Sequence, residues 1–214
     1  EAEILSLLLT CLFVFAAGVF AFSLFVPAPY GRYGRPWWSG PDLPAWAAWL
    51  LMELPQPLVF GFFWWQAARR FETTSLVFLG LWMAHYSYRC LIYPFLIRSR
   101  GMAISVVLMG MALNSAFAWL NARWLFALGP ARDLSWLSDP RFVAGSLLAV
   151  GGWLLCFHSD LILRRLRAPG ETGYRIPTGG AFRFLSAPNY AGEILMWLGW
   201  ACLSWSAAGL LIAA

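Results

Sequence analysis

The two residues best suited to chemistry are a carboxylic acid and a phenol inside long apolar stretches. Glu53 stands in the string Met52-Glu53-Leu54-Pro55, and Tyr86 follows His85. An ionisable group within a membrane span costs about 2.5–3.5 kcal/mol on insertion scales, so such residues tend to be functional. A phenol beside a carboxylic acid could hold the oxygen of a substrate carbonyl. The alternative for Glu53 is a structural acid that pairs with Arg89 across helices.

A second group of polar residues is rich in arginine. Asp160, Arg164 and Arg167 stand at i, i+4 and i+7, so they share one stripe of a helix. Arginine holds phosphates through paired hydrogen bonds, and an aspartate accepts from an amide or hydroxyl. This pattern indicates a site for a large anionic ligand. The alternative is a topology-setting helix end whose arginines extend to the membrane surface.

A third group opens the next apolar segment. Asn189 and Glu193 stand at i and i+4, and Trp197 follows one turn later. Polar groups at the start of a helix suit an anion or a ribose or amide group. Two polar groups that flank one arginine-rich loop therefore favour the same ligand.

Apolar segments must position these residues. Hydrophobic residues make up 61% of the 214 positions and charged residues 12%, whereas soluble domains carry about a quarter charged. Runs of about twenty apolar residues recur, each long enough to cross a hydrocarbon core. The sequence therefore predicts an all-α, polytopic transmembrane helical bundle, with residues 1–214 as a single domain in contact with membrane lipid.

Six spans and the start of a seventh are expected. They cover residues 4–26, 44–66, 75–97, 101–121 and 141–163, and the sixth begins near Asn189. Glu53 then lies roughly 14 Å, and Tyr86 roughly 16 Å, from the same membrane face at 1.5 Å per residue. The acid and the phenol are thus expected at similar depth.

Arginine placement predicts the orientation. Nine arginines fall in loops on one side: Arg32, Arg35, Arg98, Arg100, Arg164, Arg165, Arg167, Arg175 and Arg183. The other side holds five: Arg69, Arg70, Arg123, Arg132 and Arg141. The positive-inside rule places the first set, and with it the anion site, in the cytoplasm.

Several classes of function are disfavoured. The net charge of +5 reflects topology and lipid headgroups, so no nucleic-acid partner is expected. The cysteines stand apart inside apolar runs, and no histidine pair has ligand spacing, so no metal site is expected. No glycine-rich dinucleotide fingerprint or phosphate-binding loop is present, so any nucleotide site is of another kind.

With these residues in place, the chain resembles the steroid 5α-reductase family of integral-membrane, NADPH-dependent oxidoreductases. The matching strings run in order over most of the chain. They are Tyr30-Gly31-Arg32-Tyr33, Glu53-Leu54-Pro55, His85-Tyr86 with Arg89, His158-Ser159-Asp160 through Arg167, Pro169-Gly170-Glu171, Tyr174-Arg175-Ile176-Pro177 with Gly179-Gly180, and Asn189 with Gly192-Glu193 and Trp197.

The resemblance implies a seven-helix bundle that holds NADPH and takes a steroid from the bilayer. Glu53 and Tyr86 would hold the C3 ketone of a 3-oxo-4-ene steroid while hydride passes to C5. Trp49, Met52 and Trp197 would line the substrate. The cofactor residues by this resemblance are Tyr30, Arg89, Arg98, Arg100, Asn114, Asp160, Arg167, Tyr174, Arg175, Asn189 and Glu193.

Some positions depart from the family pattern. Met52 stands where the animal enzymes have glutamine, Cys156 where they have asparagine, and Met196 where they have an acid. Rival interpretations are a reductase of an enoyl thioester or a polyprenol-type lipid, a membrane methyltransferase, and a non-catalytic sterol-binding protein. Arginine without any lysine suggests a bacterial member, which would lie in the inner membrane. The oligomeric state is left open.

Overall fold

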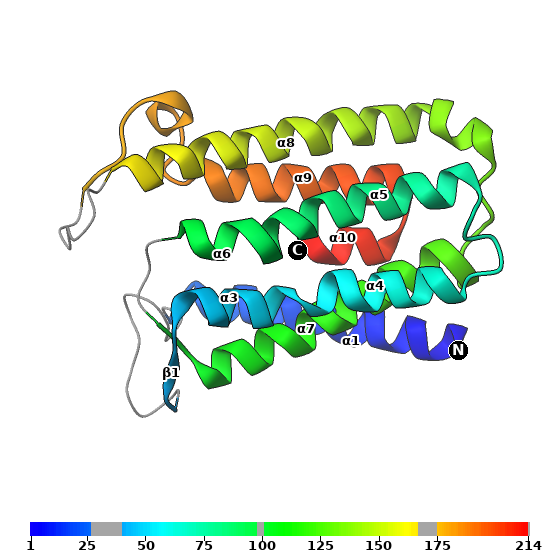
Figure 1. The fold of residues 1–214 in the computed structure, drawn as a ribbon, viewed down its shortest axis with the longest axis horizontal. Helices are drawn as coiled ribbons and strands as arrows, with labels where there is room; N and C mark the ends of the chain where they lie inside the picture. Colours follow the sequence, from blue (N-terminus) through cyan, green and yellow to red (C-terminus); the bar gives the residue numbers. More distant parts are fainter. Residues whose placement is uncertain (27–39, 98–100, 167–174, 214) are drawn as a thin grey trace. The chain divides into compact units, whose positions relative to one another are not determined.

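A computed structural model describes residues 1–26, 40–97, 101–166 and 175–213, and most of them are helical (Figure 1). Within these ranges three helices are long and apolar enough to cross a membrane, namely α1 (Ala2–Ser23), α7 with its continuation (Ile104–Leu128) and α8 (Pro140–Arg165). The expected helical fold is therefore confirmed with three candidate membrane spans, while the count of six spans stays a prediction. A short antiparallel pair, β1 (Asp42–Leu43) with β2 (Met102–Ala103), was not predicted.

The chain divides into two compact units, Glu1–Leu134 and Ser135–Ala214, which are described here one at a time. The single domain expected from the sequence stays a prediction.

In the first unit, the expected second span is interrupted beside Glu53. Helix α3 (Ala45–Glu53) ends there and α4 (Pro55–Gln66) begins two residues later. Pro55 and Pro57 have no backbone N–H, so the carbonyls four residues earlier lose their helical donors. Leu54 keeps helical dihedrals, φ −56° and ψ −34°, so the chain continues in nearly the same direction. The break leaves backbone acceptors next to the acid.

The expected third span is interrupted beside Tyr86. It consists of α5 (Thr73–Ser87), the π-helical turn η2 (Tyr88–Ile92) and α6 (Tyr93–Leu96). The backbone N–H of Tyr93 donates to the carbonyl of Tyr88, which closes the wider π turn. Single π turns inside α-helices occur often at functional sites. The turn also carries Arg89, the residue that the sequence offered as a partner for Glu53.

The core of the first unit holds these broken helices against a continuous one. Helix α7 (Ile104–Arg123), which continues as the π-helical η3 (Trp124–Leu128), packs on α3 and α4, and α5 packs on α4. Phe60 stacks on Trp82 with ring centroids 4.3 Å apart, and Phe126 meets Phe60 edge-on. An ion pair of 2.6 Å between Arg123 and Glu1 joins α7 to α1.

In the second unit, α8 and α9 (Pro188–Ser204) run antiparallel with their backbones in contact (Figure 1). A Cβ on Gly152 would lie 2.4 Å from the backbone N of Met196, and one on Gly192 would lie 2.6 Å from that of Cys156. Gly145 and Gly199 meet in the same way further along. Small residues allow such close approach in membrane helices. Helix α10 (Ala207–Ala213) follows α9.

The start of α8 is fixed by Asp139. Its carboxylate accepts from the backbone N–H of Arg141 at 2.8 Å and from the guanidinium of Arg141 at 2.9 and 2.8 Å. The hydrogen bonds from Arg141 hold the pKa of Asp139 at about 2, below its ordinary value. The guanidinium also lies over the rings of Trp136 and Trp205, at 4.5 and 5.0 Å from their centroids. The helix therefore begins at a rigid, charged cap.

Candidate functional site

Glu53 is a buried acid with an ionic partner. Its side chain is 7% exposed, and Oε1 accepts from Nη2 of Arg89 at 2.9 Å. The Arg89 guanidinium also lies over the rings of Trp49 and Tyr93, 5.1 and 4.7 Å from their centroids. The structure thus contains the ion pair that the sequence offered as the alternative for Glu53. Loss of one member of a buried pair leaves the other charge uncompensated, which is strongly destabilising.

Tyr86 lies at the level of this acid. Its residue is 3% exposed, and it stands between two contacts from α5 and η2 to the broken helix. On one side the indole N–H of Trp82 donates to the Gln56 carbonyl at 3.2 Å, and on the other Arg89 pairs with Glu53. Because Trp82, Tyr86 and Arg89 stand one turn apart, the phenol falls between these two contacts. The acid and the phenol are therefore buried at one level of the first unit.

Asn114 braces the break in the second span. Its Nδ2 donates to the Met52 carbonyl at 2.6 Å, and its Oδ1 accepts from Nε2 of Gln56 at 2.8 Å. Met52 is half-buried and packs against Gly110 of α7. Asn114 was expected among the cofactor residues; the structure places it in contact with the backbone beside Glu53.

Gln56 is a member of this network that the sequence analysis did not single out. It is 1% exposed, and its Oε1 has no hydrogen-bond donor within the described residues. The signal that could have identified it is a polar amide between two prolines, Pro55 and Pro57, in an apolar segment.

The expected anion-binding residues in the second unit gather at one end of the α8–α9 pair. Gly192 meets Cys156, so Asp160, one turn beyond Cys156, lies at the end of the pair where α9 begins with Pro188 and Asn189. The Sγ of Cys156 contacts Oδ2 of Asp160 at 4.0 Å. Glu193 and Trp197 follow on α9 and are half-buried.

The chain between α8 and α9 returns to α8. Arg175 is exposed in a segment without regular secondary structure, and the 3-10 turn η5 (Gly180–Arg183) follows it. Gly180 has a φ of +49°, and a Cβ there would lie 2.7 Å from Cε1 of His158. Glycine is therefore required where the segment meets α8. Five expected cofactor residues lie outside the described residues: Tyr30, Arg98, Arg100, Arg167 and Tyr174.

The side chains at this end of the second unit are of the chemical types that bind a dinucleotide. Guanidinium groups suit its phosphates, the carboxylates of Asp160 and Glu193 suit ribose hydroxyls, and the amide of Asn189 suits a carboxamide. Asn189 is in the first turn of a seventeen-residue helix, where backbone N–H groups are available to an anion. Over the described ranges, no group of three histidine, cysteine or acidic residues is placed to hold a metal ion.

Comparisons with known proteins identify the family of this chain. The family model described as 3-oxo-5-alpha-steroid 4-dehydrogenase matches residues 100–213. The chain is 41% identical to 3-oxo-5-alpha-steroid 4-dehydrogenase 1 of Bos taurus, over 91% of this chain and 77% of the relative. It is 40% identical to the enzyme of that name from Homo sapiens, over 89% and 74%. It is also 35% identical to steroid 5-alpha-reductase DET2 of Gossypium hirsutum, over 94% and 80%.

Identity of this level over most of both chains exceeds what a shared membrane topology alone produces. The chain belongs to the 3-oxo-5-alpha-steroid 4-dehydrogenase family of oxidoreductases.

Proposed function

We propose that this protein reduces the 4,5 double bond of a 3-oxo-4-ene steroid and uses NADPH as the reductant. The observation that carries the proposal is the burial of Glu53 and Tyr86 at one level of the first unit, in a chain that belongs to a steroid dehydrogenase family. When bound, NADPH supplies the hydride that C5 of the steroid receives.

The acid and the phenol act on the ketone oxygen. As C5 receives hydride, negative charge develops on the C3 oxygen, and the Tyr86 hydroxyl donates a hydrogen bond to it. Donors aimed at a developing oxyanion in a dry site lower the barrier most. A proton added at C4 then returns the enolate to the ketone.

The ion pair with Arg89 gives the Glu53 carboxylate a different role from that of the Tyr86 hydroxyl. Glu53 accepts from Arg89, so its carboxylate is oriented, and its charge is balanced, before a ketone arrives. Tyr86 is the hydrogen-bond donor to the ketone oxygen, and Glu53, which Arg89 orients, acts with it. Trp49, whose ring lies under Arg89, and Met52 would line the steroid.

The cofactor is assigned to polar residues of the second unit and to loop arginines. Asp160, Arg175, Asn189 and Glu193 would bind it, together with the five residues outside the described ranges. Guanidinium groups would distinguish the 2′-phosphate of NADPH from the hydroxyl of NADH. Trp197 would separate the nicotinamide from the steroid.

The test uses purified protein in detergent. NADPH absorbance is expected to fall only when a 3-oxo-4-ene steroid is added, and NADH is expected to be a poor substitute. Consumption driven by an enoyl thioester instead would identify the rival reductase. Steroid binding without any consumption would identify a sterol-binding protein.

The acid and the phenol are tested by variants that keep their shape. We expect Tyr86→Phe to lower kcat by about 10²–10³-fold, the effect of removing one oxyanion donor. Glu53→Gln is expected to lower kcat as well, because it removes the carboxylate that Arg89 orients. NADPH binding is expected to persist in both variants, and it is monitored through the quenching of tryptophan fluorescence. Glu3→Gln, at an exposed position in the first turn of α1, is the matched control. Full activity in both site variants would exclude the proposed carbonyl clamp.

A further inference from the structure

Met52 meets α7 at a glycine, in the same unit as the acid and the phenol. A Cβ on Gly110 would lie 2.5 Å from Sδ of Met52 and 3.7 Å from its Cβ. Heavy atoms that are not bonded to each other pack best at about 3.5–4.0 Å, so a side chain at Gly110 would overlap with the thioether. The Met52 side chain therefore runs across bare backbone, which only glycine provides at this position.

The same face of α7 also holds the backbone of Met52. Asn114 stands four residues after Gly110, so the two positions are neighbours on the surface of the helix. Nδ2 of Asn114 donates to the Met52 carbonyl at 2.6 Å. Met52 is thus attached to α7 twice, through its side chain at Gly110 and through its carbonyl at Asn114.

The last turn of α3 has a second set of contacts, with Arg89 of η2. Trp49 and Glu53 stand four residues apart on α3, and Arg89 contacts both. Its guanidinium lies 5.1 Å from the Trp49 ring centroid and donates to the Glu53 carboxylate at 2.9 Å. Since Glu53 directly follows Met52, the contact with α7 and the ion pair with Arg89 act on adjacent residues.

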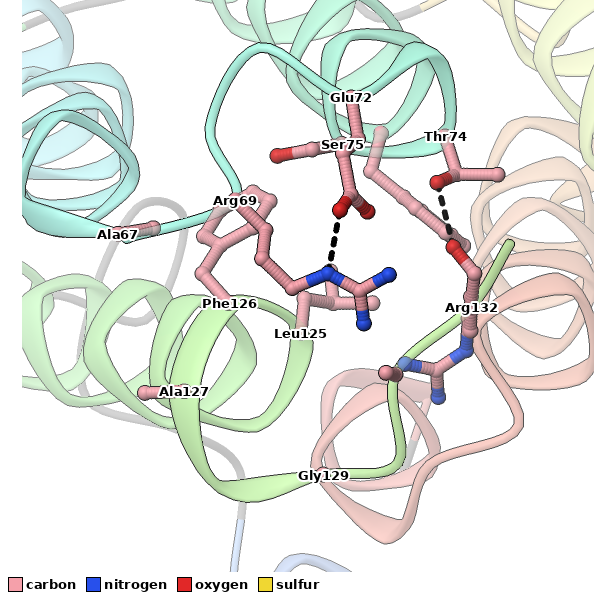
Figure 2. A pocket seen from close by; sticks show the side chains of 12 residues that line it. Ala67, Arg69, Glu72, Thr74, Ser75, Leu125, Phe126, Ala127, Gly129 and Arg132 are labelled. Atoms are coloured by element: carbon pink, nitrogen blue, oxygen red, sulfur yellow. Dashed lines mark hydrogen bonds and ion pairs between the residues drawn. The ribbon is translucent and has the colours of Figure 1, made fainter. Parts of the chain in front are cut away.

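Helix α7 is held at its far end as well. The segment that follows η3 accepts a hydrogen bond at the Arg132 carbonyl from the hydroxyl of Thr74 in the first turn of α5, at 2.6 Å (Figure 2). Arg123, at the end of α7, pairs with Glu1 at 2.6 Å. By contrast, α3 is nine residues long and ends at Glu53. A side chain added at Gly110 would therefore displace the last turn of α3 rather than α7.

We propose that Gly110 is a positioning residue for the Glu53 carboxylate. Because it has no side chain, it admits Met52 to the surface of α7. This contact determines where the last turn of α3 lies, and with it the distance from Glu53 to Arg89. The inference rests on the proposed function, in which Glu53 acts on the steroid ketone.

The first experiment needs no turnover and measures Tm of the full chain in detergent. Gly110→Ala, Glu53→Gln and the variant with both changes are compared with the wild type. Gly80→Ala is the matched control, because a Cβ at this position of α5, in the same unit, would meet nothing within 4 Å. Residues that act on one contact give effects that do not add, whereas independent residues give effects that add.

We expect Gly110→Ala to lower Tm, and Gly80→Ala to leave it unchanged or slightly higher, since alanine favours helix. Glu53→Gln is expected to lower Tm less in the Gly110→Ala background than in the wild type, because the displaced acid has already lost part of its pairing with Arg89. Additive losses of Tm, or equal effects of the two glycine substitutions, overturn the proposal.

The second experiment measures kcat and the KM for NADPH with a 3-oxo-4-ene steroid, well below the Tm of every variant. We expect Gly110→Ala to lower kcat by about 10²-fold, the effect of a misplacement of about 1 Å, with the KM for NADPH near its wild-type value. Adding Met52→Ala to Gly110→Ala removes the atoms that the new Cβ would meet. That double variant is expected to regain part of the lost kcat.

A lowered Tm with wild-type kcat in Gly110→Ala would mean that the glycine serves packing alone, and a loss of kcat that Met52→Ala does not relieve would exclude the route through Met52. Either result overturns the proposal. If the wild type consumes no NADPH with the steroid, the proposed function fails. The additivity of the Tm losses then still decides whether Gly110 positions Glu53.

Discussion

At the scale of residues, the arrangement around Glu53 joins structure to chemistry. Arg89 holds the carboxylate at 2.9 Å while its own guanidinium lies over the rings of Trp49 and Tyr93. Aromatic faces and a carboxylate together offset the loss of water around a buried guanidinium. The acid is therefore fixed in direction before a substrate arrives, which is what a preorganised site requires.

The sequence could predict those site residues whose chemical type is unusual in an apolar segment. Glu53 and Tyr86 stand out because an acid and a phenol in apolar segments are costly, and Arg89 was an available partner. The brace formed by Asn114 and Gln56 could not be predicted, because an amide gives no sign of which carbonyl it will meet. Contacts between distant segments depend on packing, which spacing along one segment does not determine.

Asp139 provides a prediction about pH. Its folded-state pKa of about 2 lies below the ordinary 3.8, so the cap stabilises the folded protein fully above about pH 4. That contribution is lost as pH falls from about 4 through 2, because protonation breaks the bonds from Arg141. We expect the Tm difference between wild type and Asp139→Asn to shrink over this interval. A difference that stayed constant down to pH 2 would show that the carboxylate is not held by Arg141.

At the scale of elements, Asn114 offers a prediction that separates two roles. It bonds to the Met52 carbonyl beside Glu53, although it was also expected to help bind cofactor. We expect Asn114→Leu to lower kcat and Tm while the KM for NADPH stays near its wild-type value. The loss of a buried hydrogen bond costs about 1–3 kcal/mol of stability. A raised KM for NADPH with unchanged Tm would instead support the cofactor role.

The two glycine faces of α8 and α9 were not anticipated, because glycine in an apolar span gives no direction by itself. Gly151 and Gly152 are neighbours with opposite surroundings. A Cβ on Gly152 would meet the Met196 backbone at 2.4 Å, whereas a Cβ on Gly151 would meet nothing within 4 Å.

We therefore expect Gly152→Ala to lower Tm, by an amount that corresponds to about 1–3 kcal/mol of overpacking. Gly151→Ala is expected to leave Tm unchanged or slightly higher, since alanine favours helix. The Tm of each variant is measured by thermal unfolding, with tryptophan fluorescence as the signal. Equal effects at the two positions would mean that the helix backbones are not in contact.

The broken spans show a different limit of prediction. Apolar length predicted spans over residues 44–66 and 75–97, and the structure has helices there, but the interruptions of these helices depend on Pro55 and on the π turn at Tyr88–Ile92. Proline marks a position where a helix can break, yet neighbouring contacts decide whether it does. Both interruptions fall beside the two candidate catalytic residues, Glu53 and Tyr86.

At the scale of the whole molecule, the orientation in the membrane remains a prediction from arginine placement. Single cysteines at Ser138 and Ser186 are expected to lie on opposite sides, with Ser186 in the cytoplasm. A membrane-impermeant thiol reagent applied to intact cells should label Ser138→Cys, and should label Ser186→Cys only after lysis. The wild-type chain serves as the control for its own four cysteines. Labelling of both positions in intact cells would contradict the predicted topology.

The contact between α8 and α9 also limits how a lipophilic molecule can travel. Glycine backbones touch in two pairs, Gly145 with Gly199 and Gly152 with Gly192. No gap remains there through which a rigid, four-ringed molecule could slip, and the two helices cannot slide apart without losing several such contacts together. A steroid dissolved in the bilayer must therefore enter and leave by another route than the seam between these two helices.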